Sequence, residues 1–189
     1  DYVALKLPRW PWDKFSEGKK TLGTQMKATG EVMAIGRTFQ EALGKGISSM
    51  DQKNELWGKI GASDLPREQI TEGLKAADDT RLMWIFRALA KGISPSEVSG
   101  ITGIDGFFVD CIAAMVQAER ALADCRERVS SMKRGDRDMG VADTLRRAKQ
   151  LGISDRRIAA LWGVNEKAVR DVREDWAVKP AFKMVDTCA

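Results

Sequence analysis

The chain has 189 residues, of which 43% are hydrophobic and 31% charged, as in one or two globular domains and unlike a disordered or fibrous protein. No apolar run approaches the roughly 20 residues of a membrane-spanning helix. The lack of histidine excludes histidine zinc sites, Ser-His-Asp triads and imidazole acid–base catalysis in this segment. The net charge is +4, with +3 carried by residues 1–50 and only +1 by the 139 residues that follow. Nucleic-acid-binding domains are normally far more basic on one face, because phosphate neutralisation supplies most of their affinity.

Strands are expected near the N-terminus. Weak alternation over Tyr2–Leu7 predicts a strand bounded by Pro8, and residues 24–27 and 32–35 predict two further extended runs. A strand cluster this small cannot form a sheet core by itself. We therefore expect that the chain begins inside a larger domain whose other strands lie elsewhere.

One helix follows the strands. Thr38 and Glu41 form a capping box for a helix that runs to about Met50. Residues 51–66 are polar and contain glycine, as in a linker. We therefore divide the chain into residues 1–50, an α+β remnant, and residues 51–189, which are almost wholly helical.

The pattern of residues 51–189 predicts helices separated by short turns. Asp79 is a candidate cap for one helix, Ser94 begins a capping box with proline at the next position, and Asp105 caps a long helix with Phe108 on its apolar side. A charged, glycine-containing loop is predicted at residues 129–140. Further helices are predicted at residues 141–176, and an extended or loop segment at residues 178–189.

Residues 90–109 resemble residues 150–169 at a constant offset of 60 positions. Each copy reads as the end of a helix, a glycine, a serine-capped short helix, a second glycine and a capped longer helix. Identical pairs in the two copies are Gly92/Gly152, Ile93/Ile153, Ser94/Ser154, Gly103/Gly163 and Val109/Val169. Two copies are too few for a solenoid array.

Such a unit is either a DNA-binding helix-turn-helix or a tightly turned helix pair used for packing. The second helix of the later copy carries as many acids as bases, and that of the earlier copy carries Phe107 and Phe108 instead of phosphate-binding groups. Packing is therefore the favoured interpretation, and a paired helix-turn-helix nucleic-acid binder is the alternative.

The densest polar stretch, residues 24–37, holds the candidate functional side chains. Lys27 and Arg37 can meet phosphate or carboxylate groups, and Glu31 can pair with either. Ion pairs that tie the strands to their missing neighbours are the favoured interpretation. The glycine spacing fits neither a Walker loop nor a dinucleotide fingerprint.

The spacing of the cysteines indicates neither a metal site nor a disulfide framework. Cys111, Cys125 and Cys188 lack paired spacing, Cys111 falls on an apolar helical face, and the charged first residues do not resemble a secretory signal. We expect Cys111 to pack in the core and the protein to be cytoplasmic.

The chain resembles a known family from end to end, the large subunit of carbamoyl phosphate synthetase. Residues 6–10, 14–15 and, most specifically, 24–39 resemble the end of its carboxyphosphate-forming ATP-grasp domain; residues 104–108 and 151–155 resemble its oligomerisation domain; residues 180–189 resemble the stretch that leads toward its second synthetic half. The resemblance implies a mostly α fold: a helical oligomerisation domain with two repeated helix-turn-helix-like units, preceded by a small α+β remnant of an ATP-grasp domain.

The resemblance also implies a function. Members of the family are ATP-dependent ligases that make carbamoyl phosphate from bicarbonate, ammonia and two ATP, with Mg or Mn and potassium, for pyrimidine and arginine synthesis. Ammonia comes from glutamine through a glutaminase partner, and the helical domain implies self-association. The nucleotide and metal sites would lie outside this segment, so no catalytic, cofactor-binding or metal residue is assigned. Met26, Lys27 and Glu31 are candidates only for support or tunnel-wall roles, and the segment alone is expected to be inactive. A third possibility, an adaptor whose helices only bind protein, leaves the specific N-terminal stretch unexplained.

Overall fold

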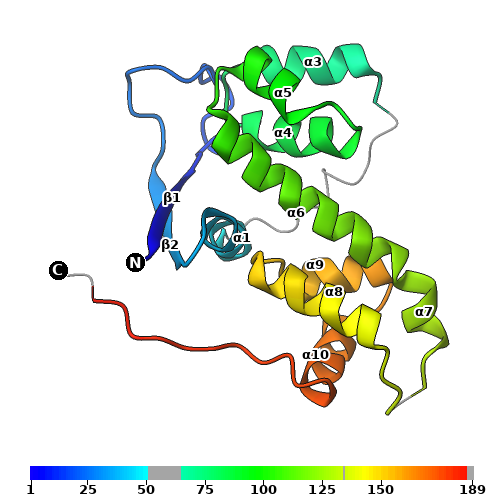
Figure 1. The fold of residues 1–189 in the computed structure, drawn as a ribbon. Helices are drawn as coiled ribbons and strands as arrows, with labels where there is room; N and C mark the ends of the chain where they lie inside the picture. The colour runs from blue at the N-terminus through cyan, green and yellow to red at the C-terminus, as the bar shows by residue number, and fades with distance from the viewer. Residues whose placement is uncertain (51–64, 134, 187–189) are drawn as a thin grey trace.

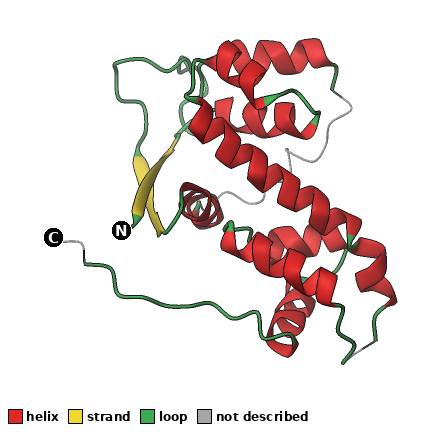
Figure 2. Cartoon of the chain, viewed as in Figure 1, coloured by secondary structure: helices red, strands yellow, loops and turns green. Residues whose placement is uncertain are grey.

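The computed structural model describes residues 1–50, 65–133 and 135–186. Its architecture is mostly α, with a small antiparallel sheet at the N-terminus (Figures 1 and 2). In chain order the elements are β1 (Val3–Arg9), β2 (Gly30–Gly36), α1 (Phe39–Ser49), α3 (Arg67–Lys75), α4 (Arg81–Ala90), α5 (Pro95–Thr102), α6 (Gly106–Asp124), α7 (Arg126–Ser131), α8 (Met139–Gln150), α9 (Asp155–Trp162) and α10 (Glu166–Asp175).

The sheet has two strands, β1 and β2, paired from Val3↔Gly36 to Arg9↔Gly30. One face packs on α1 through Leu5 and Leu7, and the other carries exposed Met33. The predicted extended run at residues 24–27 is wrong, because this stretch bends as part of the long connection between the strands. Pro8 does not end β1. A strand with an unpaired edge needs no amide donor there, so it tolerates proline.

The helices form two groups with separate apolar cores, joined by α6, which runs diagonally between them (Figure 1). The first core lies among α1, α3, α4, α5 and the start of α6, around fully buried Phe86 and Met115. The second lies among the end of α6 and α7 to α10, around Leu145 and Trp162. The predicted packing role of Cys111 is confirmed, since it is 7% exposed.

The predicted repeat is confirmed as two copies of one structural unit, α4–α5–α6 and α8–α9–α10. Gly92 and Gly152 have φ of +85° and +80°, and Gly103 and Gly163 have +69° and +72°. These left-handed conformations suit glycine, because a Cβ would be strained there.

The helix caps repeat as well. Ser94 accepts a hydrogen bond from the Glu97 amide, and Ser154 accepts one from the Arg157 amide, each at 3.2 Å. The capping side chains that start the two longer helices are Asp105 and Asn165. Local cap and turn chemistry therefore fixes both copies.

Helix α1 belongs to the helical core as well as to the sheet. A Cβ on Gly46 would lie 2.8 Å from Leu7 Cδ1 of β1. On another side of the helix, a Cβ on Gly44 would strike the Gly152 carbonyl, and a Cβ on Gly152 would lie 2.8 Å from the Glu41 carbonyl oxygen. The helix therefore passes between the sheet, which it meets through the Leu7 side chain, and the second copy of the repeat, where backbone lies almost against backbone.

Three local predictions in the helical part are corrected. Asp79 does not cap α4; Thr80 takes that position, and the Asp78 carboxylate accepts from the Thr80 amide at 2.8 Å. Residues 129–140 are helical up to Ser131 in α7 and again from Met139 in α8. Phe108 is 41% exposed and lies edge-on to Phe39, so it does not join the apolar side of α6. Of the predicted linker at residues 51–66, residues 51–64 lie outside the described residues, and residues 65 and 66 belong to no helix or strand.

Candidate functional site

The loop at residues 10–29, which connects β1 to β2, contains two of the predicted site residues. Met26, near the end of this loop, is 91% exposed. Lys27 points back into the loop, where its Nζ donates to the carbonyl of Lys19 at 2.9 Å and to the carbonyl of Thr21. Lys27 therefore fixes the shape of the loop, and Met26 presents its thioether away from it.

The third predicted residue, Glu31, lies on β2 and pairs with Lys6 of β1 at 2.7 Å, with side-chain exposures of 56% and 62%. An exposed pair of this kind contributes little stability. The structure does not join Glu31 to either predicted partner, Lys27 or Arg37. Instead, the Arg37 amide donates to Glu41 in the cap of α1.

The loop surface does not form a nucleotide pocket of ordinary depth. It has a shallow depression of about 190 Å³ lined by Trp10, Leu22, Met26 and Lys27 together with residues 23, 25 and 28. In the part of the chain that the structure describes, no group of three or more Cys, Asp or Glu side chains could hold a metal ion. These residues do not fit ATP or its metal ions.

The loop is anchored on the helical domain at the turn between α3 and α4. The Leu22 amide donates to the Ala77 carbonyl at 2.7 Å. The indole N–H of Trp12 lies beside the Asp79 carboxylate and favours its charged form, although Trp12 Nε1 and Asp79 Oδ1 are both buried without a completed hydrogen bond. Burial raises the pKa of Asp79 despite the attraction of nearby Lys20.

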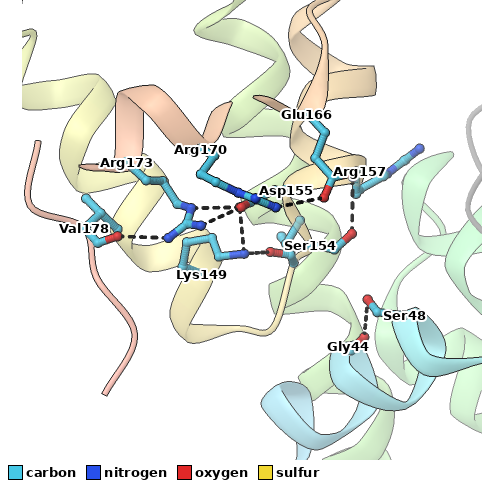
Figure 3. A network of polar contacts seen from close by, with 11 residues as sticks. Gly44, Ser48, Lys149, Ser154, Asp155, Arg157, Glu166, Arg170, Arg173 and Val178 are labelled. Atoms are coloured by element: carbon cyan, nitrogen blue, oxygen red, sulfur yellow. Dashed lines mark hydrogen bonds and ion pairs between the residues drawn. The ribbon is translucent and has the colours of Figure 1, made fainter. Parts of the chain in front are cut away.

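A polar network holds the second copy of the repeat together (Figure 3). Asp155, at the first position of α9, accepts two hydrogen bonds from Arg173 of α10, at 2.6 and 3.0 Å, on its Oδ2. Lys149 of α8 approaches Oδ1 at 3.0 Å as an ion pair. Burial raises the pKa of Asp155, but these cationic partners outweigh it and lower the pKa below its usual value.

The same arginine fixes the start of the C-terminal segment. Arg173 Nη1 donates to the Val178 carbonyl at 3.2 Å (Figure 3). Trp176 is 3% exposed and donates its indole N–H to the Asp136 carbonyl. Between them Ala177 has a φ of +55°, a rare conformation for a residue with a Cβ. The direction in which residues 179–186 leave the domain is therefore set by α10 and its neighbours.

A second buried ion pair connects the long helix α6 to α9. Arg157 donates to both carboxylate oxygens of Glu119 at 2.8 Å, and the two side chains are 10% and 9% exposed. The sequence did not predict these residues as partners, because 38 positions separate them. A glutamate among the apolar residues of a predicted helix is the one signal that could have marked the site.

The surface of α10 does not offer a row of free bases to a phosphate backbone. Lys167 pairs with Asp171 at 2.8 Å, Arg170 lies 3.9 Å from Glu166, and Arg173 is committed to Asp155. Because the cations are neutralised within the helical domain, the geometry favours packing over groove binding.

The helix topology and the repeat define a helical domain built on two copies of one helix-turn-helix-like unit. Residues 31–177 match the family described as "Carbamoyl-phosphate synthetase large chain, oligomerisation domain". The chain belongs to this family. It is also 40% identical over 197 aligned positions to the "Carbamoyl phosphate synthase large chain, N-terminal section" of Methanopyrus kandleri, a match that covers 100% of this chain and 34% of that protein. The chain thus spans about a third of the length of this curated relative.

In the part of the chain that the structure covers, no helix is both long and apolar enough to cross a bilayer.

Proposed function

We propose that this chain is a segment of an ATP-dependent ligase that makes carbamoyl phosphate from bicarbonate, ammonia released from glutamine, and two ATP. The observation that carries the proposal is the 40% identity to a carbamoyl phosphate synthase large chain along the whole segment. Within that enzyme the segment supplies structure and subunit association. The family's description as an oligomerisation domain supports self-association through the helices.

The ligase would act in the cytoplasm, with a glutaminase subunit or domain as its partner and its product feeding pyrimidine and arginine synthesis. It would use ATP, Mg or Mn, and potassium. Since the described residues do not fit these groups, we place the sites in parts of the longer protein outside this segment. ATP would supply the phosphoryl groups that activate bicarbonate and carbamate.

Residues 1–50 would then be the end of the carboxyphosphate ATP-grasp domain, and residues 51–189 the oligomerisation domain leading toward the second synthetic half. Exposed Met33 on the sheet and Met26 on the loop support this division, because both leave apolar surface for other parts of the enzyme to cover. Met26 would line the wall of a tunnel or site, and Lys27 and Glu31 would support its loop and strand.

The test compares the full-length protein with this segment. With labelled bicarbonate, ammonia and ATP, the full-length protein should form carbamoyl phosphate and the segment should hydrolyse no ATP in a bicarbonate-dependent way. Light scattering of the segment should show a mass above 20.9 kDa. Full-length protein without carbamoyl phosphate formation refutes the ligase assignment, and a strictly monomeric segment at high concentration refutes its role in association.

A further inference from the structure

The turn between α3 and α4 is the place where the helical domain holds the β1–β2 loop. The Leu22 amide and the Ala77 carbonyl, 2.7 Å apart, form a backbone hydrogen bond across this contact. The two residues are far apart in the sequence and belong to the two parts into which we divide the chain. The bond therefore reports directly on whether the loop rests on the helices.

At the same turn, the Trp12 indole lies beside the Asp79 carboxylate without a completed hydrogen bond. Trp12 stacks on Trp10 with their rings 6.1 Å apart and nearly parallel, and its ring fills the space where a Cβ on Gly18 would be. Its buried Nε1 and the buried Oδ1 of Asp79 both lack a hydrogen-bond partner. A buried donor beside a buried acceptor is costly when unpaired, so a small movement that joins them is favourable.

The contact extends to the site candidates through the loop itself. Lys27 Nζ donates to the carbonyls of Lys19 and Thr21, and Leu22 follows directly. The α3–α4 turn holds Leu22, and the carbonyls of Lys19 and Thr21 hold Lys27. Met26, which is 91% exposed, is the residue directly before Lys27. Each step is a short contact made by backbone or by a fixed ammonium group.

We propose that Asp79 is a positioning residue which, by accepting a hydrogen bond from the Trp12 indole, fixes the loop carrying Met26 and Lys27 in place for the rest of the enzyme. The catalytic consequence rests on the proposed function, whereas the contact itself does not. The position of the loop is then linked to the helical domain at this one turn.

Hydrogen exchange of the Leu22 amide in this chain tests the contact. Asp79→Ala and Trp12→Phe should each raise the exchange rate roughly fivefold, the effect of losing one ordinary hydrogen bond from the closed state. The double variant should exchange no faster than either single variant, because both remove the same bond. Asp79→Asn keeps an acceptor oxygen and should stay near wild type, as should the control Asp124→Asn at an exposed position on α6. Unchanged exchange in both single variants, or effects that multiply in the double variant, overturns the proposal.

Bicarbonate-dependent ATP hydrolysis by the full-length protein tests the consequence. Asp79→Ala should lower the turnover rate several-fold, and Asp79→Asn and Asp124→Asn should leave it unchanged. Faster Leu22 exchange with undiminished hydrolysis would overturn the positioning role while keeping the contact. A wild-type full-length protein that lacks bicarbonate-dependent ATP hydrolysis would refute the proposed function. The hydrogen-exchange result would be unaffected by that outcome, because it tests only the contact between the loop and the α3–α4 turn.

Discussion

The matched glycines of the repeat allow a sharp test of how α1 packs. Gly92 and Gly152 have almost the same backbone conformation, with φ of +85° and +80°. A Cβ on Gly92 would meet nothing within 4 Å, whereas a Cβ on Gly152 would lie 2.8 Å from the Glu41 carbonyl oxygen of α1. Alanine substitution therefore imposes the same backbone strain at both positions and a collision at only one.

The magnitudes follow from these two terms. The left-handed conformation costs about 1 kcal/mol for a residue with a Cβ, so Gly92→Ala should lower the free energy of unfolding by about that amount. Gly152→Ala adds an overpacking cost of about 1–3 kcal/mol, since the obstacle is helix backbone and not a mobile side chain. The total at position 152 is about 2–4 kcal/mol.

Urea unfolding of this chain, followed by circular dichroism, measures the difference. With a denaturant slope near 2 kcal/mol/M, the midpoint should fall by about 0.5 M for Gly92→Ala and about 1–2 M for Gly152→Ala. Gly44→Ala, the reciprocal change on α1, should also lower the midpoint, even though alanine is the better helix former. Equal losses at positions 92 and 152 would refute the close crossing of α1 over the Gly152 turn.

Three further outcomes are expected. Glu119→Ala leaves Arg157 as an uncompensated charge in a buried site and should lower the free energy of unfolding by about 3 kcal/mol in urea titrations. Asp155 has a lowered pKa in the folded state, so its stabilising contribution is present above its ordinary pKa and is lost as the pH falls through the folded value. Asp155→Asn should therefore flatten the fall of the urea midpoint below about pH 4. Ser94→Ala and Ser154→Ala each remove an equivalent helix cap and should each cost about 1 kcal/mol in the same assay.

The controls use exposed groups. Lys167→Ala breaks a pair with Asp171 whose side chains are 80% and 54% exposed, and should cost less than about 0.5 kcal/mol. If Glu119→Ala costs no more than this, the Glu119–Arg157 pair is not a desolvated one. An Asp155→Asn variant with the same acid profile as wild type would contradict the ion pairs with Lys149 and Arg173.

The repeat could be predicted because its determinants are local. Serine caps, left-handed glycines and apolar spacing act within one turn of helix. Gly92 and Ser94 therefore specify the same helix end and helix cap as Gly152 and Ser154 do. The end of β1 and the bent run at residues 24–27 could not be predicted, since strands depend on partners that the local pattern does not name.

The polar interactions between helices and strands could not be predicted from the sequence either. Glu119 and Arg157 are 38 positions apart, and Asp155 and Arg173 are 18 apart, so only the packing of the helices brings them together. The same holds for Trp12 and Asp79, which local patterning presents as a loop aromatic and a candidate cap. The site candidates Lys27 and Glu31 were recognised from residue type, but their actual partners required the folded loop and strand pairing.

The glycines of α1 make its contact with the second copy of the repeat stiffer than its contact with the sheet. Where Gly46 meets Leu7 and Gly44 meets Gly152, no long side chain of α1 lies between the surfaces to bend or change rotamer. Close-packed contacts of this kind transmit strain with little loss. A shift of α1 toward the Gly152 turn would therefore displace that turn with it, whereas the Leu7 side chain between α1 and the sheet can still change its rotamer.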